Sequence, residues 1–107
     1  MEAHFETWIL EACILNILVS KDAYGYELAK SDMLKISDSA IYPVLRRLTD
    51  KGCLTVSSHI HEARLRKIYR ITPEGRNRLI QLKAEWHVFQ KNVNEILESS
   101  TPILSGL

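Results

Sequence analysis

The sequence has little of what an enzyme or a cross-linked secreted protein usually contains. Its 107 residues include only two cysteines, four glycines and three prolines. Cys13 and Cys53 stand alone without a CxxC pair, so we expect both to be reduced and to act as small hydrophobic side chains. Four glycines leave little room for a phosphate-binding loop, and the sequence has no nucleophile elbow and no HExxH motif. We therefore expect no enzyme, no catalytic residue and no cofactor.

Long hydrophobic runs and a basic leader are also absent. No apolar stretch approaches the ~18–20 residues that cross a bilayer. Residues 1–6 lack the basic region that begins a signal peptide. We therefore expect no membrane partner and a cytoplasmic location. With 46% hydrophobic and 25% charged residues, the composition is that of one globular domain with one core.

The charge is small in total but uneven along the chain. The net charge is +1, yet residues 37–78 carry nine Lys and Arg against four acids, and acids outnumber Lys and Arg on both sides. A basic segment between acidic flanks is typical of a surface that binds a polyanion such as nucleic acid. On charge alone, a solvated charged surface explains the pattern equally well.

Two helices are predicted before the basic segment. Residues 5–19 are apolar on nearly every face, which indicates a helix that is buried on several sides and meets a second subunit. Asp22 is expected to cap a short helix over residues 24–32. Gly25 lowers the helix propensity of that segment, so it indicates the close approach of another element.

A third helix is predicted over residues 37–51. Ser37 or Ser39 is expected to be its N-cap, and Gly52 is expected to end it. Pro43 lacks a backbone N–H, so it should lie near the first turns or at a kink. The inward face is an apolar stripe at helical spacing, formed by Ile41, Val44, Leu45 and Leu48.

A β-hairpin is predicted after the third helix. Residues 54–60 alternate with a period of two, and a second strand is expected over residues 66–72. The link over residues 61–65 is short enough for a hairpin. His59 and His61 are placed to share one strand face, but two ligands do not make a metal site, so we expect none.

The last helix is predicted to be unusually long. Thr72 is expected to cap it, with Pro73 in the first position, and residues 99–102 are expected to end it. A helix of about 25 residues overhangs the core of so small a chain, so its apolar seam should pack on a second subunit. This seam begins at Leu79, and the predicted dimer interface consists of Leu82, Trp86, Phe89, Val93 and Ile96.

The order of three helices, a basic hairpin and a final helix is that of a winged helix-turn-helix, an α+β fold that is mostly α. We expect residues 1–72 to form the DNA-binding domain and residues 73–107 to form the dimerisation helix of the same structural unit. The residues expected to contact duplex DNA are Ser39, Tyr42, Arg46, Arg47, Arg64, Arg66 and Lys67. The alternative is a winged helix that binds another protein, because a fold does not determine its function.

Several short motifs resemble the PadR family of bacterial transcription regulators over nearly the whole chain. They are Tyr24-Gly25-Tyr26-Glu27-Leu28, Ile41-Tyr42-Pro43 with Leu45 and Leu48, Lys51-Gly52, Arg66-Lys67, and Tyr69-Arg70-Ile71-Thr72 with Gly75. The single long C-terminal helix resembles the small PadR subfamily that includes multidrug-binding regulators. The resemblance implies a winged-helix homodimer that binds a palindromic operator, usually to repress transcription.

The resemblance also implies roles for individual residues of the DNA-binding part. Tyr42 matches the family tyrosine that approaches DNA, and Arg66 and Lys67 match basic residues of the family's wing. The family usually has a glycine and a further basic residue before this pair, whereas this chain has Arg64 and Leu65. The resemblance therefore does not determine the contacts at the tip of the wing, although it still implies the fold.

A ligand pocket is the last feature that the resemblance implies. Trp86 matches a tryptophan that lines the central drug pore of the multidrug-binding members. Trp8 in the first helix is placed to wall the same space, and two indoles make a slot for a small planar aromatic effector. The alternative is that both tryptophans belong to a filled core and interface.

Overall fold

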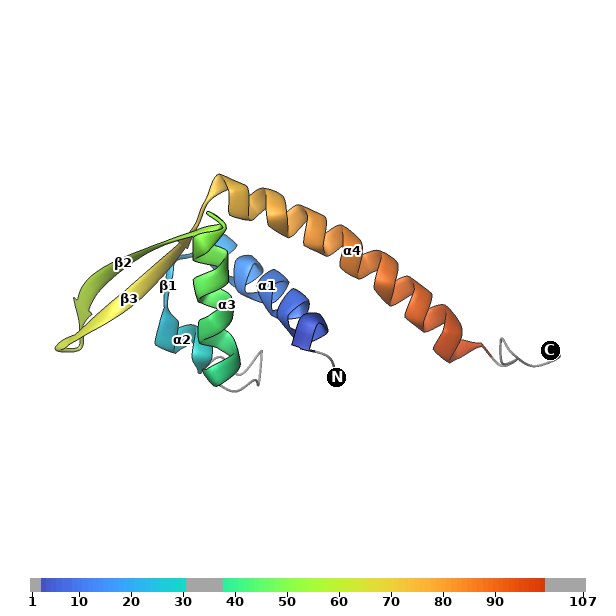
Figure 1. Ribbon diagram of the computed structural model, residues 1–107, viewed down its shortest axis with the longest axis horizontal. Helices are drawn as coiled ribbons and strands as arrows, with labels where there is room; N and C mark the ends of the chain where they lie inside the picture. Colours follow the sequence, from blue (N-terminus) through green and yellow to red (C-terminus); the bar gives the residue numbers. More distant parts are fainter. Residues whose placement is uncertain (1–2, 31–37, 100–107) are drawn as a thin grey trace.

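The computed structural model describes residues 3–30 and 38–99, except for the side chains of residues 3–6 and 38–39. In this part the chain forms four helices and one three-stranded antiparallel sheet (Figure 1). The predicted α+β, mostly helical winged fold is confirmed. None of the described helices is both long and apolar enough to cross a membrane. In order, the elements are α1 (Ala3–Ser20), β1 (Ala23–Tyr24), α2 (Gly25–Ala29), α3 (Asp38–Asp50), β2 (Leu54–His61), β3 (Arg64–Ile71) and α4 (Pro73–Glu98).

The hydrophobic core lies where α1, α3, the base of the sheet and the first turns of α4 meet. Ile14 of α1, Leu45 of α3 and Leu82 of α4 have no exposed surface, and Leu54 of β2 is 2% exposed. Burial of each such side chain stabilises the fold by about 1.5–3 kcal/mol. Because Leu82 belongs to this core, its side chain is already covered within its own chain.

The chain enters α2 differently from the prediction. α2 is shorter than expected, and the N–H of Tyr24 before it donates to the Glu27 carboxylate at 2.8 Å. Asp22 is not the cap, because its Oδ2 accepts hydrogen bonds from the Arg70 guanidinium of β3 at 2.8 and 3.0 Å. The folded sheet brings the Arg70 guanidinium close to Asp22, so two charged N–H donors bind the carboxylate that was expected to cap the helix.

The two ends of α3 are defined by different features. The helix begins at Asp38, so Ser39 lies inside its first turn and is not the N-cap, whereas Ser37 lies outside the described residues. Gly52 ends the helix as predicted, with a φ of 79°.

Two hydrogen bonds close the end of α3. The Gly52 N–H donates to the Thr49 carbonyl at 3.0 Å, and the Cys53 N–H donates to the Leu48 carbonyl at 2.8 Å. This pair of bonds is a Schellman motif, which satisfies the last helical carbonyls and favours glycine in the left-handed region. The motif turns the chain directly into β2 and so sets the direction in which the hairpin leaves α3.

The hairpin of β2 and β3, called the wing below, has a shorter turn than predicted. β2 continues to His61 and β3 begins at Arg64, so Glu62 and Ala63 alone form the link instead of residues 61–65. Both residues have positive φ, at 54° and 62°, which is the signature of a type I′ turn whose twist matches that of a hairpin. Neither residue is Gly or Asn, so the sequence carries no signal for this turn.

The helix α4 begins as predicted and extends well beyond the core (Figure 1). The Thr72 hydroxyl donates to the Gly52 carbonyl at 2.6 Å and accepts from the Gly75 N–H at 3.0 Å. Among the 26 residues of the helix, the buried ones lie in its first half and end at Leu82. Figure 1 shows the C-terminal end of α4 extending beyond α1, on the side away from the wing. The second half of α4 leaves the large apolar side chains of Val88, Phe89, Ile96 and Leu97 exposed.

Candidate nucleic-acid interface

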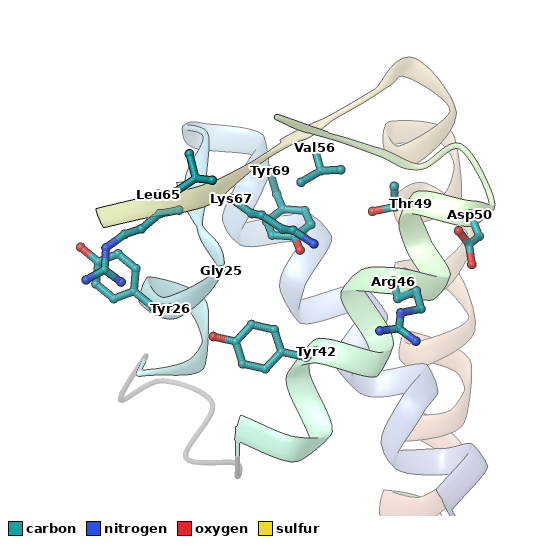
Figure 2. Close-up of a pocket in the computed structure, with 11 residues that line it drawn as sticks. Gly25, Tyr26, Tyr42, Arg46, Thr49, Asp50, Val56, Leu65, Lys67 and Tyr69 are labelled. Atoms are coloured by element: carbon teal, nitrogen blue, oxygen red, sulfur yellow. The ribbon is translucent and has the colours of Figure 1, made fainter. Parts of the chain in front are cut away.

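A groove of about 460 Å³ lies between α3 and the wing (Figure 2). Residues of α3 line one side, residues of the wing line the other, and the start of α2 closes one end. The cationic side chains in this lining suit the phosphate backbone of a nucleic acid. The lining residues are Gly25, Tyr26, Tyr42, Arg46, Thr49, Asp50, Val56, Leu65, Arg66, Lys67 and Tyr69.

The α3 side of the groove presents Tyr42 and Arg46. The apolar stripe of α3 is buried as predicted, because Ile41 is 0% and Val44 is 2% exposed. Tyr42 and Arg46 are four residues apart, so they lie on the same side of the helix, and Tyr42 is 45% exposed. Figure 2 shows both side chains extending from α3 into the space below the wing. The Ser39 side chain is outside the described residues, so its predicted contact stays a prediction.

Arg47 has a partner inside its own chain. Its Nε lies 3.4 Å from Oε2 of Glu11 on α1, and Nζ of Lys51 lies 3.6 Å from the same oxygen. The other oxygen of Glu11 lies 3.3 Å from Arg78 of α4. Glu11 is only 3% exposed, so this carboxylate joins three elements in a buried ion cluster. The predicted contact of Arg47 with DNA would be an additional role, and it stays a prediction.

The wing residues divide between two strand faces. Lys67 lies on the same face as Tyr69, and both line the groove. Arg64 and Arg66 alternate with them and therefore start from the opposite face. Arg66 nevertheless reaches the groove, because its guanidinium lies over the Tyr26 ring with Cζ at 3.9 Å from the ring centre. The predicted pair Arg66 and Lys67 is thus brought to one groove from two faces of the same strand.

The end of the groove at α2 depends on Gly25, where the predicted close approach is confirmed. A Cβ at this position would lie 3.2 Å from the Tyr69 ring and 3.3 Å from the Tyr42 ring. Burial raises the pKa of Tyr69, Tyr42 adds to this shift, and Arg46 acts in the opposite direction. The Tyr69 hydroxyl therefore stays neutral at physiological pH and is able both to donate and to accept a hydrogen bond.

A second cluster joins α1 to the projecting half of α4. The Trp8 and Trp86 ring centres are 6.2 Å apart, and Trp8 meets Phe89 edge-on at 5.8 Å. The Trp8 Nε1 donates to Glu85 at 3.0 Å. The structure thus brings the two predicted pocket tryptophans together within one chain. A surface hollow of about 530 Å³ beside them is lined by Trp8, Ala84, Glu85, Val88, Phe89 and Asn92, and not by Trp86.

The two wing histidines have separate neighbours. Nε2 of His59 lies 3.1 Å from the Ser57 hydroxyl, whereas His61 stacks on Tyr24 with ring centres 4.5 Å apart. Among the described residues, no three His, Cys, Asp or Glu side chains lie close enough together to hold a metal ion. We therefore assign no metal role to the described part of the wing.

Comparison with known proteins connects this geometry to a family. The family model described as "Transcriptional regulator PadR-like family" matches residues 14–81, from the core of α1 into α4. The crystal structure of smu.1704 from Streptococcus mutans is 33% identical, has a TM-score of 0.78, and aligns over 87% of this chain and 90% of that one. A PadR family regulator from Eggerthella lenta is 35% identical with a TM-score of 0.75, over 85% and 83% of the two chains. A Mycobacterium tuberculosis protein named a transcriptional regulator is 36% identical over 47 residues, which is 44% of each chain.

Proposed function

Because the chain belongs to the PadR-like family of transcriptional regulators, we propose that it is a ligand-responsive repressor that binds a palindromic operator in duplex DNA as a homodimer. The observation that carries the proposal is the groove between α3 and the wing, where Arg46, Arg66 and Lys67 converge. This convergence supplies positive charge beside a helix that is free on its outer face, as a helix-turn-helix needs. We place the protein in the cytoplasm, where a regulator reaches the chromosome.

In this proposal, α3 enters the major groove of DNA. Tyr42 and Arg46 lie along its outer side, and Ser39 is the third contact that we predict from this helix. Arg46 offers the forked donors that match a phosphate or a guanine edge. Arg47 at the border of this side contacts a phosphate while keeping its partner Glu11. The wing follows the neighbouring backbone through the phosphate contacts of Arg64, Arg66 and Lys67.

The homodimer in this proposal forms through residues 73–107, with residues 1–72 as the DNA-binding part. Phe89 is 41% and Ile96 is 58% exposed, and Val93 and Trp86 are half-buried, so this stripe of α4 has apolar surface for a second subunit. Leu82 is buried in the core of its own chain, so in this proposal it packs beneath the interface residues and does not itself contact the second subunit. A two-fold dimer sets the two copies of α3 about 34 Å apart, which matches successive major grooves of a palindrome.

Selection of bound sequences from a random duplex pool tests this proposal and gives the operator. The triple variant Arg46→Ala, Arg66→Ala and Lys67→Ala should bind the selected operator much more weakly and reduce the salt slope by about one per lost phosphate contact. The matched control is Lys21→Ala, Arg76→Ala and Lys83→Ala, which removes the same charge from exposed positions outside the groove. Equal affinities for the two triple variants would contradict the assigned surface. If no duplex sequence is selected, the alternative of a protein partner is favoured instead. Binding to such a partner through an apolar interface should be insensitive to salt.

A further inference from the structure

The contact between Tyr26 and Arg66 joins α2 to the wing. Cζ of Arg66 lies 3.9 Å from the centre of the Tyr26 ring, which is well within the range of a strong cation–π contact. Lys30 approaches the same ring only to 5.5 Å. The wing's arginine is therefore the main cation on this ring, although it belongs to a different element of the fold.

The Tyr26 ring is itself held in place by neighbouring rings. Tyr24 lies 5.9 Å from it and His61 lies 6.2 Å from it, between ring centres. Tyr24 and His61 in turn stack on each other at 4.5 Å and 23°. Arg66 thus rests on a packed aromatic platform and not on a single mobile side chain.

This platform of Tyr24, Tyr26 and His61 lies near the point where β1 stops pairing with β3 of the wing. β1 pairs with β3 only at Tyr69 and Ile68, so Arg66 lies two residues beyond the end of that register. From there to the turn, the sheet consists of β2 and β3. The position of the Arg66 guanidinium therefore depends on the ring beneath it.

We propose that Tyr26 is a positioning residue for DNA binding, which holds the Arg66 guanidinium over its ring so that the terminal N–H groups face a DNA phosphate. A stacked guanidinium uses its face for the ring and leaves its planar donor edge free for a bidentate contact with an anion. A side chain that is fixed before binding loses less conformational freedom when it binds. This inference rests on the proposed function, because it assigns a role to Tyr26 only if the wing contacts DNA.

A double-mutant cycle on operator affinity tests the inference. Tyr26→Leu should weaken binding about three- to tenfold, because it removes the platform but no charge. Tyr26→Phe keeps the ring, so its affinity should stay within about twofold of the unmodified protein. In an Arg66→Ala background, Tyr26→Leu should have no further effect, and the salt slope of the two Arg66→Ala proteins should be the same.

A second variant keeps the test decisive if Tyr26→Leu fails to fold. Arg66→Lys retains the charge but loses the flat guanidinium, so it should weaken binding as much as Tyr26→Leu is expected to, with an unchanged melting temperature. The inference is overturned if Tyr26→Leu weakens binding equally with and without Arg66, since Tyr26 would then act through the fold alone. It is also overturned if Arg66→Lys or Arg66→Ala binds like the unmodified protein. Absence of DNA binding by the unmodified protein would instead overturn the proposed function itself.

Discussion

The Glu11 carboxylate lies 3.4 Å from the Nε of Arg47, so a buried acid of α1 holds the base of the helix that we propose enters DNA. Lys51 and Arg78 approach the same carboxylate at 3.6 and 3.3 Å. Its side chain is 4% exposed, whereas those of its three partners are 33–46% exposed. One carboxylate therefore fixes α3, the turn after it and α4 relative to α1, while the cations keep access to water.

Removal of this carboxylate should destabilise the fold strongly. Glu11→Ala leaves three cations close together with no counter-charge, and because these cations are partly exposed to water, we expect a loss of about 1–3 kcal/mol in the free energy of unfolding. Denaturant titration measures this change. Asp22→Ala is the control, because it removes the acid paired with the largely exposed Arg70, where a much smaller loss is expected. Similar losses for both variants would contradict a structural role for Glu11.

A second prediction concerns the start of α4, where Gly75 has no room for a side chain. A Cβ at this position would lie 2.2 Å from the Cys53 carbonyl oxygen and 2.7 Å from Cγ1 of Ile71. Because the nearer atom is backbone, Gly75→Ala must shift α4 or the strand, which costs about 1–3 kcal/mol or more. Gly52→Ala meets no atom within 4 Å and strains only the backbone at φ 79°. Thermal unfolding should therefore show the larger drop in melting temperature for Gly75→Ala.

The winged fold was predictable because local signals and long-range packing agree in most of the chain. The Thr72-Pro73 start, the Gly52 stop and the stripe around Leu45 each specify their element without knowledge of the rest. The Asp22 cap failed because its actual partner, Arg70, is 48 residues away in the sequence. Local reasoning has no access to such a contact until the sheet is formed.

The groove was predictable only in part, for a similar reason. Tyr42, Arg46 and Lys67 follow from the outer face of a helix and the charge of a hairpin. Tyr26 and Tyr69 were not predicted as site residues, because a tyrosine in a helix or strand has the same pattern whether it supports the core or lines a groove. The buried carboxylate of Glu11 had no signal either, since it lies within an apolar helix and its partners belong to three later segments.

Dimer formation through the second half of α4 gives a third prediction. The protein should sediment at micromolar concentration with about twice its mass of 12.3 kDa. Ile96→Asp should produce a folded monomer, because Ile96 is 58% exposed within one chain and a charge there disrupts only a contact between chains. Asn94→Asp adds the same charge beside Lys91 and Glu98 on the polar side of α4, and it should remain a dimer. A monomeric unmodified protein would contradict the proposed assembly.

The geometry of the tryptophan cluster restricts where a planar effector is able to bind. Trp8 and Trp86 are tilted by 57° with ring centres 6.2 Å apart. A flat ring inserted between two others needs parallel faces about 7 Å apart, so it does not fit between these two indoles as they stand. Phe89 closes the third side, at 5.8 Å from Trp8 and 6.2 Å from Trp86. A planar ligand must therefore stack on the outside of this cluster, on the side that the second subunit would cover in the proposed homodimer.

The fourth prediction follows from this restriction: a planar aromatic ligand should need both the indole and the dimer. Proflavine, titrated without DNA, should quench the tryptophan emission of the unmodified protein through stacking and apolar burial. Trp86→Ala should abolish the quenching, whereas Asn94→Asp should leave it unchanged. The monomeric Ile96→Asp variant should also lose it, although its Trp8 and Trp86 remain in contact, because the covering subunit is missing. Quenching that persists in this variant would place the dye on the hollow beside Trp8. No quenching by a wide panel of planar dyes at high micromolar concentration would mean that the cluster is interface core alone.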